Sequence, residues 1–153
     1  MDLLLWRHAE AHELTDGQTD LERALTSKGE KQAHRVAKWL DQQLPEGARI
    51  YSSPATRTVQ TVRHLQRKYK VRDALAPGAS VADVLECAQW PSARHPVLIV
   101  GHQPVLGDLI ASVLGMTGEP MSVRKGSLWW LRCRQREGHV QTTVMTVVCP
   151  EYL

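Results

Sequence analysis

The stretch Pro96-Val97-Leu98-Ile99-Val100-Gly101 decides the fold class. Its apolar residues follow one another without polar alternation, which is typical of a strand covered on both faces by other elements. Two shorter candidate strands, residues 2–6 and 49–52, precede it. Strands buried on both faces occur mainly in parallel sheets flanked by helices, so the pattern predicts a parallel sheet between helical layers.

Helical periodicity fills the intervals between these strands. Apolar residues recur at helical spacing in the first interval: Ala33, Val36, Ala37, Leu40 and Leu44. The S-x-x-E pair of Ser27 and Glu30 predicts a capping box at the start of this helix, and Pro45 and Gly47 predict its end. Further helices are predicted near residues 55–69, 80–90 and 104–114.

The C-terminal third contains two β-rich segments, residues 128–134 and 140–148, on either side of a turn at 136–139. They predict a hairpin with antiparallel pairing. The expected fold class is therefore α/β, a three-layer α/β/α sandwich whose mostly parallel sheet ends in an antiparallel C-terminal hairpin. The chain has 153 residues and no repeat or linker, so residues 1–153 are expected to form a single domain.

Composition excludes several classes of protein. Hydrophobic residues make up 42% of the chain and charged residues 23%, which is typical of a globular domain and not of a disordered chain. No apolar run approaches the ~18 residues of a membrane span, and the N-terminal segment does not resemble a signal peptide, so a cytoplasmic protein is expected. The three cysteines are widely spaced, and neither a disulfide framework nor a zinc site is expected.

Arginine and histidine residues follow three of the predicted strands. Arg7 and His8 follow the first, Arg57 lies shortly after the second, and Gly101-His102 ends the third. Because ligands bind beyond the carboxyl ends of parallel strands, these side chains are expected to form one anion pocket. Arginine binds phosphate through paired donors, and a neutral histidine ring can attack phosphorus.

Four segments together resemble the histidine phosphatase superfamily, whose fold is phosphoglycerate mutase-like. They are Leu5-Trp6-Arg7-His8-Ala9, Arg23-Ala24-Leu25-Thr26-Ser27-Lys28-Gly29, the segment from Ser52-Ser53-Pro54 to Arg57 and Thr61, and Val100-Gly101-His102. Their order and spacing match across essentially the whole chain. The short length is similar to that of the small branch of SixA-type phosphohistidine phosphatases.

The resemblance implies a role for each site residue. His8 would attack the substrate phosphorus and become transiently phosphorylated, and water would then release inorganic phosphate. Arg7, Arg57 and His102 would hold the phosphoryl oxygens. Substrate-binding roles are also expected for Arg23, Ser53 and Gly101. No metal or other cofactor is required, because arginine and histidine supply the positive charge.

The expected substrate follows from a missing acid. Ala74 stands where relatives that cleave phosphate esters carry an acidic residue, and phosphohistidine has a leaving group that solvent can protonate. The short interval between Pro77 and Val97 leaves no room for a cap over the pocket. The predicted partner is therefore a histidine-phosphorylated protein, of HPt type or a phosphotransfer-system carrier.

Other interpretations stay open. A phosphatase for small esters could use Asp73 or Glu10 as its acid, and a non-catalytic phosphoprotein-binding module would keep the same pocket. Arg63, Arg67 and Lys70 recur at helical spacing and predict a basic stripe, either a solvated helix face or a docking surface for an acidic protein. Neither a nucleic-acid nor a membrane partner is expected.

Overall fold

Six strands form one sheet in the order β3-β2-β4-β1-β5-β6 in the computed structural model, which describes residues 1–153. The strands are β1 (Asp2–Arg7), β2 (Arg49–Ser52), β3 (Lys70–Val71), β4 (Val97–Gly101), β5 (Leu128–Arg136) and β6 (His139–Val148). The pairs β1–β4, β4–β2 and β2–β3 are parallel, whereas β5 pairs antiparallel with both β1 and β6. The predicted mixed sheet with its antiparallel hairpin is confirmed.

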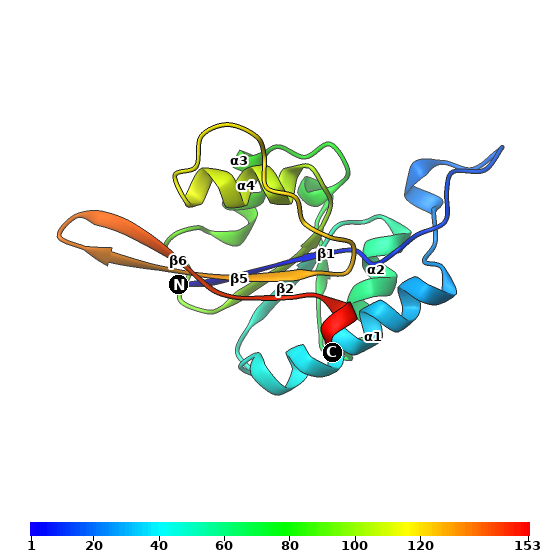
Figure 1. The fold of residues 1–153 in the computed structure, drawn as a ribbon, viewed down its shortest axis with the longest axis horizontal. Helices are drawn as coiled ribbons and strands as arrows, with labels where there is room; N and C mark the ends of the chain where they lie inside the picture. Colours follow the sequence, from blue (N-terminus) through cyan, green and yellow to red (C-terminus); the bar gives the residue numbers. More distant parts are fainter.

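Helices cover both faces of this sheet and give three layers (Figure 1). They are α1 (Ser27–Gln43), α2 (Thr56–Arg63), α3 (Val81–Ala88) and α4 (Val105–Val113), with short 3₁₀ turns η1 (Asp20–Glu22), η2 (Asp73–Leu75) and η3 (Pro150–Tyr152). Helices α1 and α2 lie on one face, and α3 and α4 lie on the other. The predicted α/β/α sandwich is therefore confirmed. No helix is both long and apolar enough to cross a membrane.

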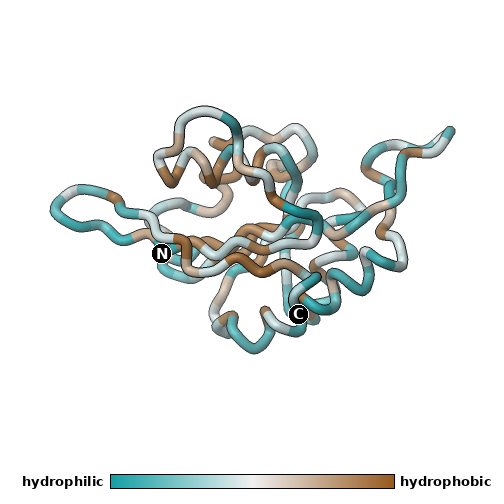
Figure 2. The backbone as a smooth tube through the Cα atoms, in the orientation of Figure 1, coloured by the Kyte–Doolittle hydropathy of each residue, from teal (hydrophilic) through white to brown (hydrophobic).

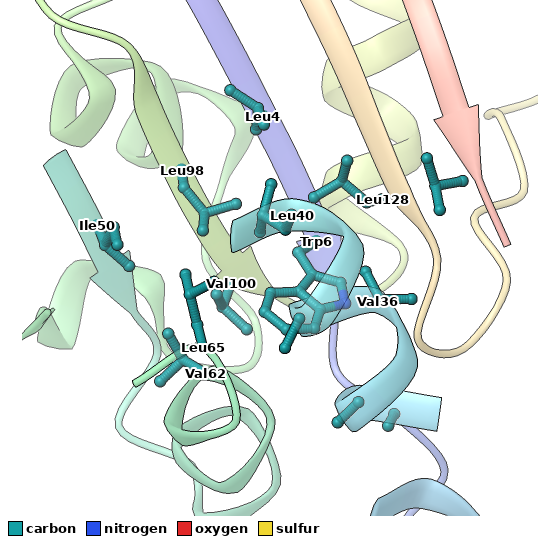
Figure 3. Packing of buried hydrophobic residues seen from close by; sticks show 14 of the residues in the cluster. Leu4, Trp6, Val36, Leu40, Ile50, Val62, Leu65, Leu98, Val100 and Leu128 are labelled. Atoms are coloured by element: carbon teal, nitrogen blue, oxygen red, sulfur yellow. The ribbon is translucent and has the colours of Figure 1, made fainter. Parts of the chain in front are cut away.

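Alternate residues of the central strands enter two apolar clusters. On β1, Leu4 and Trp6 pack toward α1 and α2 (Figure 3), whereas Leu3 and Leu5 pack toward α3 and α4. Burying one such side chain contributes about 1.5–3 kcal/mol, which explains the unbroken apolar runs at residues 3–6 of β1 and 97–100 of β4. Figure 2 shows the same distribution, with hydrophobic residues in the centre of the sheet and hydrophilic residues at the tip of the β5–β6 hairpin.

The first residue of α1 differs from the prediction. Thr26 caps the helix, since its hydroxyl accepts from the Gly29 amide at 3.0 Å, and Ser27 is already helical. Thr26 is fixed in this position by Glu10, whose carbonyl accepts from the Thr26 amide and whose carboxylate accepts from the Thr26 hydroxyl. The predicted capping box at Ser27 and Glu30 is therefore wrong, whereas an unpredicted capping box of Ser80 and Asp83 stands at the start of α3.

Helix α2 is shorter than predicted. It ends at Arg63 and not near residue 69, and Gln66 adopts a left-handed φ of 55° that reverses the chain toward β3. Arg67 leaves the helix direction and binds the Asp41 carboxylate of α1 at 2.9 Å, and Lys70 belongs to β3. The predicted basic stripe is therefore wrong, because its members do not share one helix face.

Candidate active site

Three loops leave the sheet side by side at the carboxyl ends of β1, β4 and β2. Strand β4 lies between β1 and β2. The residues that follow β1 and β2 stay hydrogen-bonded to β4. The His8 amide donates to the Gly101 carbonyl at 3.1 Å, and the Ser53 amide donates to the Val100 carbonyl at 3.0 Å. The structure thus brings the three predicted segments together at one edge of the sheet.

The rings of His8 and His102 lie next to each other, tilted, at this edge of the sheet. Their centroids are 5.4 Å apart at an interplanar angle of 54°, and the residues are only 7% and 4% exposed. The Nδ1 atom of His8 lies 2.7 Å from the Ala9 carbonyl oxygen. A carbonyl can only accept, so Nδ1 carries the proton and Nε2 keeps its lone pair. That tautomer leaves Nε2 as the nucleophilic atom.

His102 is held by a serine from the neighbouring strand end. Its Nε2 lies 2.7 Å from the Ser53 hydroxyl, which connects the β4 and β2 loops. The predicted site residue Ser53 therefore contacts His102. At Gly101, an added β-carbon would meet Leu106 at 3.6 Å, an ordinary contact, so the protein itself leaves room there.

Two arginines bring buried donors to the same place. The guanidinium of Arg7 donates from Nη1 to the Val123 carbonyl at 2.7 Å, and Arg57 enters from the first turn of α2. The Nε atoms of both arginines and the Nδ1 atom of His102 are buried without a partner in the protein. Unpaired buried polar atoms are rare and cost about 1–3 kcal/mol each, and the two arginine Nε–H groups among them can only donate. Their concentration here fits a ligand that supplies several acceptors, as a phosphoryl group does.

Burial and positive charge lower the pKa of both histidines. Burial lowers the pKa of His8 to about 4. The hydrogen bond to Ala9 acts in the opposite direction, and the charges of the nearby arginines lower the pKa further. Burial and the Arg57 charge lower the pKa of His102 to about 3. Burial and the Arg57 charge likewise lower the pKa of Arg7 below its ordinary value. Both rings are therefore neutral near pH 7, while the arginines carry the positive charge.

Arg23 shares a carboxylate with Arg57. The Asp20 carboxylate binds Arg23 at 3.2 Å through one oxygen and Arg57 at 3.0 Å through the other. The Asp20 carbonyl accepts a further bond from Arg57 Nη1 at 2.8 Å. Asp20 was missed by the sequence analysis, because a carboxylate in a polar loop has no periodicity that would single it out.

Thr61 is a second residue whose contribution was not predicted. Its hydroxyl accepts from the Ala9 amide at 3.1 Å and donates to the Arg57 carbonyl at 2.7 Å. A single side chain thus connects the loop that carries His8 with the helix that carries Arg57. The resemblance included Thr61 in the segment that begins at Ser52-Ser53-Pro54, and the structure gives the physical reason for a threonine at this position.

The carboxylates considered as proton donors have other surroundings. Glu10 accepts from the Thr26 hydroxyl at the start of α1, and Asp73 is exposed on η2. For Asp20, burial acts to raise the pKa, but hydrogen bonds from Arg57 and Arg23 hold it below the ordinary value. No three histidine, cysteine or carboxylate side chains gather where they could hold a metal ion.

Comparisons with known proteins agree with this geometry. The family profile of the histidine phosphatase superfamily (branch 1) matches residues 3–79. An uncharacterized protein of Picosynechococcus is 30% identical over 163 residues, covering 100% of this chain and 99% of the relative. The phosphohistidine phosphatase SixA homolog of Haemophilus influenzae is 30% identical over 131 residues, covering 75% of this chain and 78% of that protein.

A solved structure of the protein histidine phosphatase SixA, complexed with tungstate, superposes with a TM-score of 0.77 at 23% identity, covering 99% of each chain. The structural likeness confirms the phosphoglycerate mutase-like fold. The chain belongs to the histidine phosphatase superfamily and is a phosphatase. Within that superfamily it falls in the small SixA-type branch.

Proposed function

We propose that this protein hydrolyses phosphohistidine on another protein, by a metal-independent reaction with a phosphorylated His8 intermediate. The partner would be an HPt-type domain or a phosphotransfer-system carrier. The observation that carries the proposal is the tautomer of His8, whose proton lies on Nδ1 against the Ala9 carbonyl. A binding module would not need a neutral, oriented nucleophile in its phosphate pocket.

The proposed reaction has two displacements. In the first, His8 Nε2 attacks phosphorus, the N–P bond of the substrate breaks, and the substrate imidazole takes a proton from solvent as it leaves. In the second, water attacks the phosphorus on His8, releases inorganic phosphate and restores the neutral ring. Both steps retain the phosphoryl charge in one pocket, where preorganised donors stabilise the transition states.

The buried donors define the proposed phosphate-binding set. Arg7 and Arg57 would each use an unpaired Nε atom, and His102 its unpaired Nδ1 atom. Arg23 would contact the substrate from the edge of the pocket, Ser53 would keep His102 in place, and Gly101 would let the main chain approach the phosphoryl group. Because arginine stays charged, this set needs no metal ion to neutralise the phosphoryl group.

The choice of an N–P substrate rests on the carboxylates. Ester cleavage at neutral pH needs a general acid with a raised pKa to protonate the leaving oxygen. The carboxylate that contacts the pocket arginines, Asp20, has a lowered pKa instead. Two curated relatives are named phosphohistidine phosphatase SixA or its homolog, which supports the same substrate class for this chain.

The test compares three probes in the presence of a chelator: an HPt domain phosphorylated with phosphoramidate, free phosphohistidine and p-nitrophenyl phosphate. The variants are wild type, His8→Ala and, as a matched control, His139→Ala at the exposed tip of the hairpin. We expect rapid phosphate release from the HPt domain by wild type and by His139→Ala, and a loss of roughly 10³-fold or more with His8→Ala.

Three outcomes would contradict the proposal. Residual turnover by His8→Ala within a few-fold of wild type would exclude His8 as the nucleophile. A rate that requires added metal would exclude the metal-independent reaction. Preferential hydrolysis of p-nitrophenyl phosphate would point to a small-ester phosphatase, and Asp73 would be the next residue to replace.

A further inference from the structure

We infer that Asp20 is a positioning residue, which orients Arg57 and Arg23 so that Arg57 presents its Nε edge to a phosphoryl group. The inference rests on the proposed phosphate pocket and adds a residue to it. It concerns how the pocket is assembled and not which molecule carries the phosphoryl group.

Asp20 occupies both terminal nitrogens of Arg57. Its carbonyl oxygen accepts from Nη1 at 2.8 Å, and its carboxylate accepts from Nη2 at 3.0 Å. A planar guanidinium held at two nitrogens cannot rotate about its long axis without breaking both bonds. The remaining nitrogen, Nε, is buried and has no partner in the protein. The carboxylate supplies the second of these two anchors, so together with the Asp20 main-chain carbonyl it fixes the direction in which the free Nε edge of Arg57 points.

The second carboxylate oxygen of Asp20 extends the same arrangement to Arg23. It accepts from Arg23 Nη1 at 3.2 Å, while Arg23 Nε donates to the His12 carbonyl at 2.7 Å. Arg23 is thus also held at two nitrogens. One carboxylate fixes the spacing between a buried arginine of the pocket and a partly exposed arginine at its edge.

Other surroundings of Asp20 do not explain its position. Its side chain is 48% exposed, and it begins the 3₁₀ turn η1 without acting as a cap. η1 buries none of its residues, so the fold gains little from the Asp20 side chain itself. The Arg57 and Arg23 hydrogen bonds hold the pKa of Asp20 below its ordinary value, so the carboxylate is ionised and suits an acceptor of these bonds better than a proton donor. The contacts that remain are those to the two arginines.

Two effects of Asp20 on anion binding oppose each other. Its negative charge repels a phosphoryl group, whereas the orientation it gives to Arg57 favours binding. The carboxylate is half exposed, so solvent weakens the repulsion, while the buried Nε edge of Arg57 acts in a poorly hydrated site where its hydrogen bonds are stronger. We therefore expect orientation to outweigh repulsion, and removal of Asp20 to weaken anion binding.

A double-mutant cycle tests this inference without turnover. The dissociation constant of inorganic phosphate is measured by phosphorus NMR titration for wild type, Asp20→Ala, Arg57→Ala and the double variant. We expect Asp20→Ala to weaken binding about tenfold when Arg57 is present and less than twofold when it is absent, as for residues that act through one another. Asp20→Asn, which keeps an acceptor, is expected to lose less than Asp20→Ala. Glu22→Gln, on the same turn, should bind phosphate like wild type.

Each result has one meaning. Equal losses in both backgrounds would show that Asp20 supports the pocket in some other way, and tighter phosphate binding by Asp20→Ala would show that charge repulsion dominates; both overturn the inference. Thermal unfolding of each variant checks that the fold is retained, and Asp20→Asn serves where Asp20→Ala is not folded. Phosphate binding does not depend on the substrate, so a failure of the proposed phosphohistidine activity leaves this test intact.

Discussion

Lowering the pH from 7 to 5 is expected to destabilise the fold through two side chains, His8 and His102. Both are buried in the neutral form, with pKa values lowered to about 4 and about 3 from an ordinary value of 6.5. The unfolded chain therefore takes up protons below pH 6.5 that the folded chain does not. The contribution of the two histidines to the free energy of unfolding is fully present above pH 6.5 and is lost as the pH falls toward the folded pKa values.

The size of the effect follows from these pKa values. At pH 5, the unfolded state gains about 2 kcal/mol relative to the folded state from each histidine, or roughly 4 kcal/mol from both. Asp2, Asp20 and Asp83 have lowered pKa values, so their contributions are lost only below about pH 4. The interval from pH 7 to 5 therefore lies above the range in which these three carboxylates lose their contributions.

The assay is urea denaturation at pH 5, 6 and 7 for wild type, His8→Asn, His102→Gln and the double variant. Each single variant should lose about half of the pH dependence, and the double variant should lose nearly all of it. His95→Gln, an exposed residue, is the control and should keep the wild-type slope. A free energy of unfolding that changes equally with pH in wild type and in the double variant would refute the reasoning.

Three further predictions concern contacts that hold the site. Thr61→Val should lower the free energy of unfolding by about 1–3 kcal/mol, since the buried Ala9 amide loses its acceptor, and Thr61→Ser should restore most of it in urea denaturation. Thr26→Ala should cost about 0.5–2 kcal/mol as a lost helix cap, whereas Ser27→Ala should cost under about 0.5 kcal/mol; equal losses by calorimetry would contradict the cap assignment. Gly29→Ala should cost roughly 1–3 kcal/mol, because its β-carbon would strike a main-chain carbonyl, and a thermal midpoint equal to that of wild type would disprove the close approach.

Burial patterns made the sheet and its helices predictable. The apolar run at the centre of β4 is buried on both faces, so its sequence reports its environment directly. The turn of the hairpin was also predictable, because a glycine at residue 138 suits a turn in which Glu137 and Gly138 both adopt positive φ values. Strand β3 was not predicted, because its two residues, Lys70 and Val71, are exposed and pair only at the edge of the sheet.

Tertiary contacts decided the features that the sequence left open. Either Thr26 or Ser27 can cap a helix, and the hydrogen bonds from Thr26 to Glu10 select the first. The apolar spacing that predicted a longer α2 continues past Arg63. The left-handed φ of Gln66 is incompatible with a right-handed helix, so the helix cannot continue through it. At the pocket, strand ends positioned the motif residues, whereas Asp20 reaches Arg57 across 37 positions of the chain.

The hydrogen bond from His8 to the Ala9 carbonyl has a chemical consequence for any trapped intermediate. With Nδ1 committed to that carbonyl, a phosphoryl group captured on His8 is carried on Nε2, so only one of the two phosphohistidine isomers can form. An antibody raised against that isomer should stain the acid-sensitive intermediate on a blot, and an antibody against the other isomer should not. The isomer of phosphohistidine found on His8 would then report the orientation of its ring.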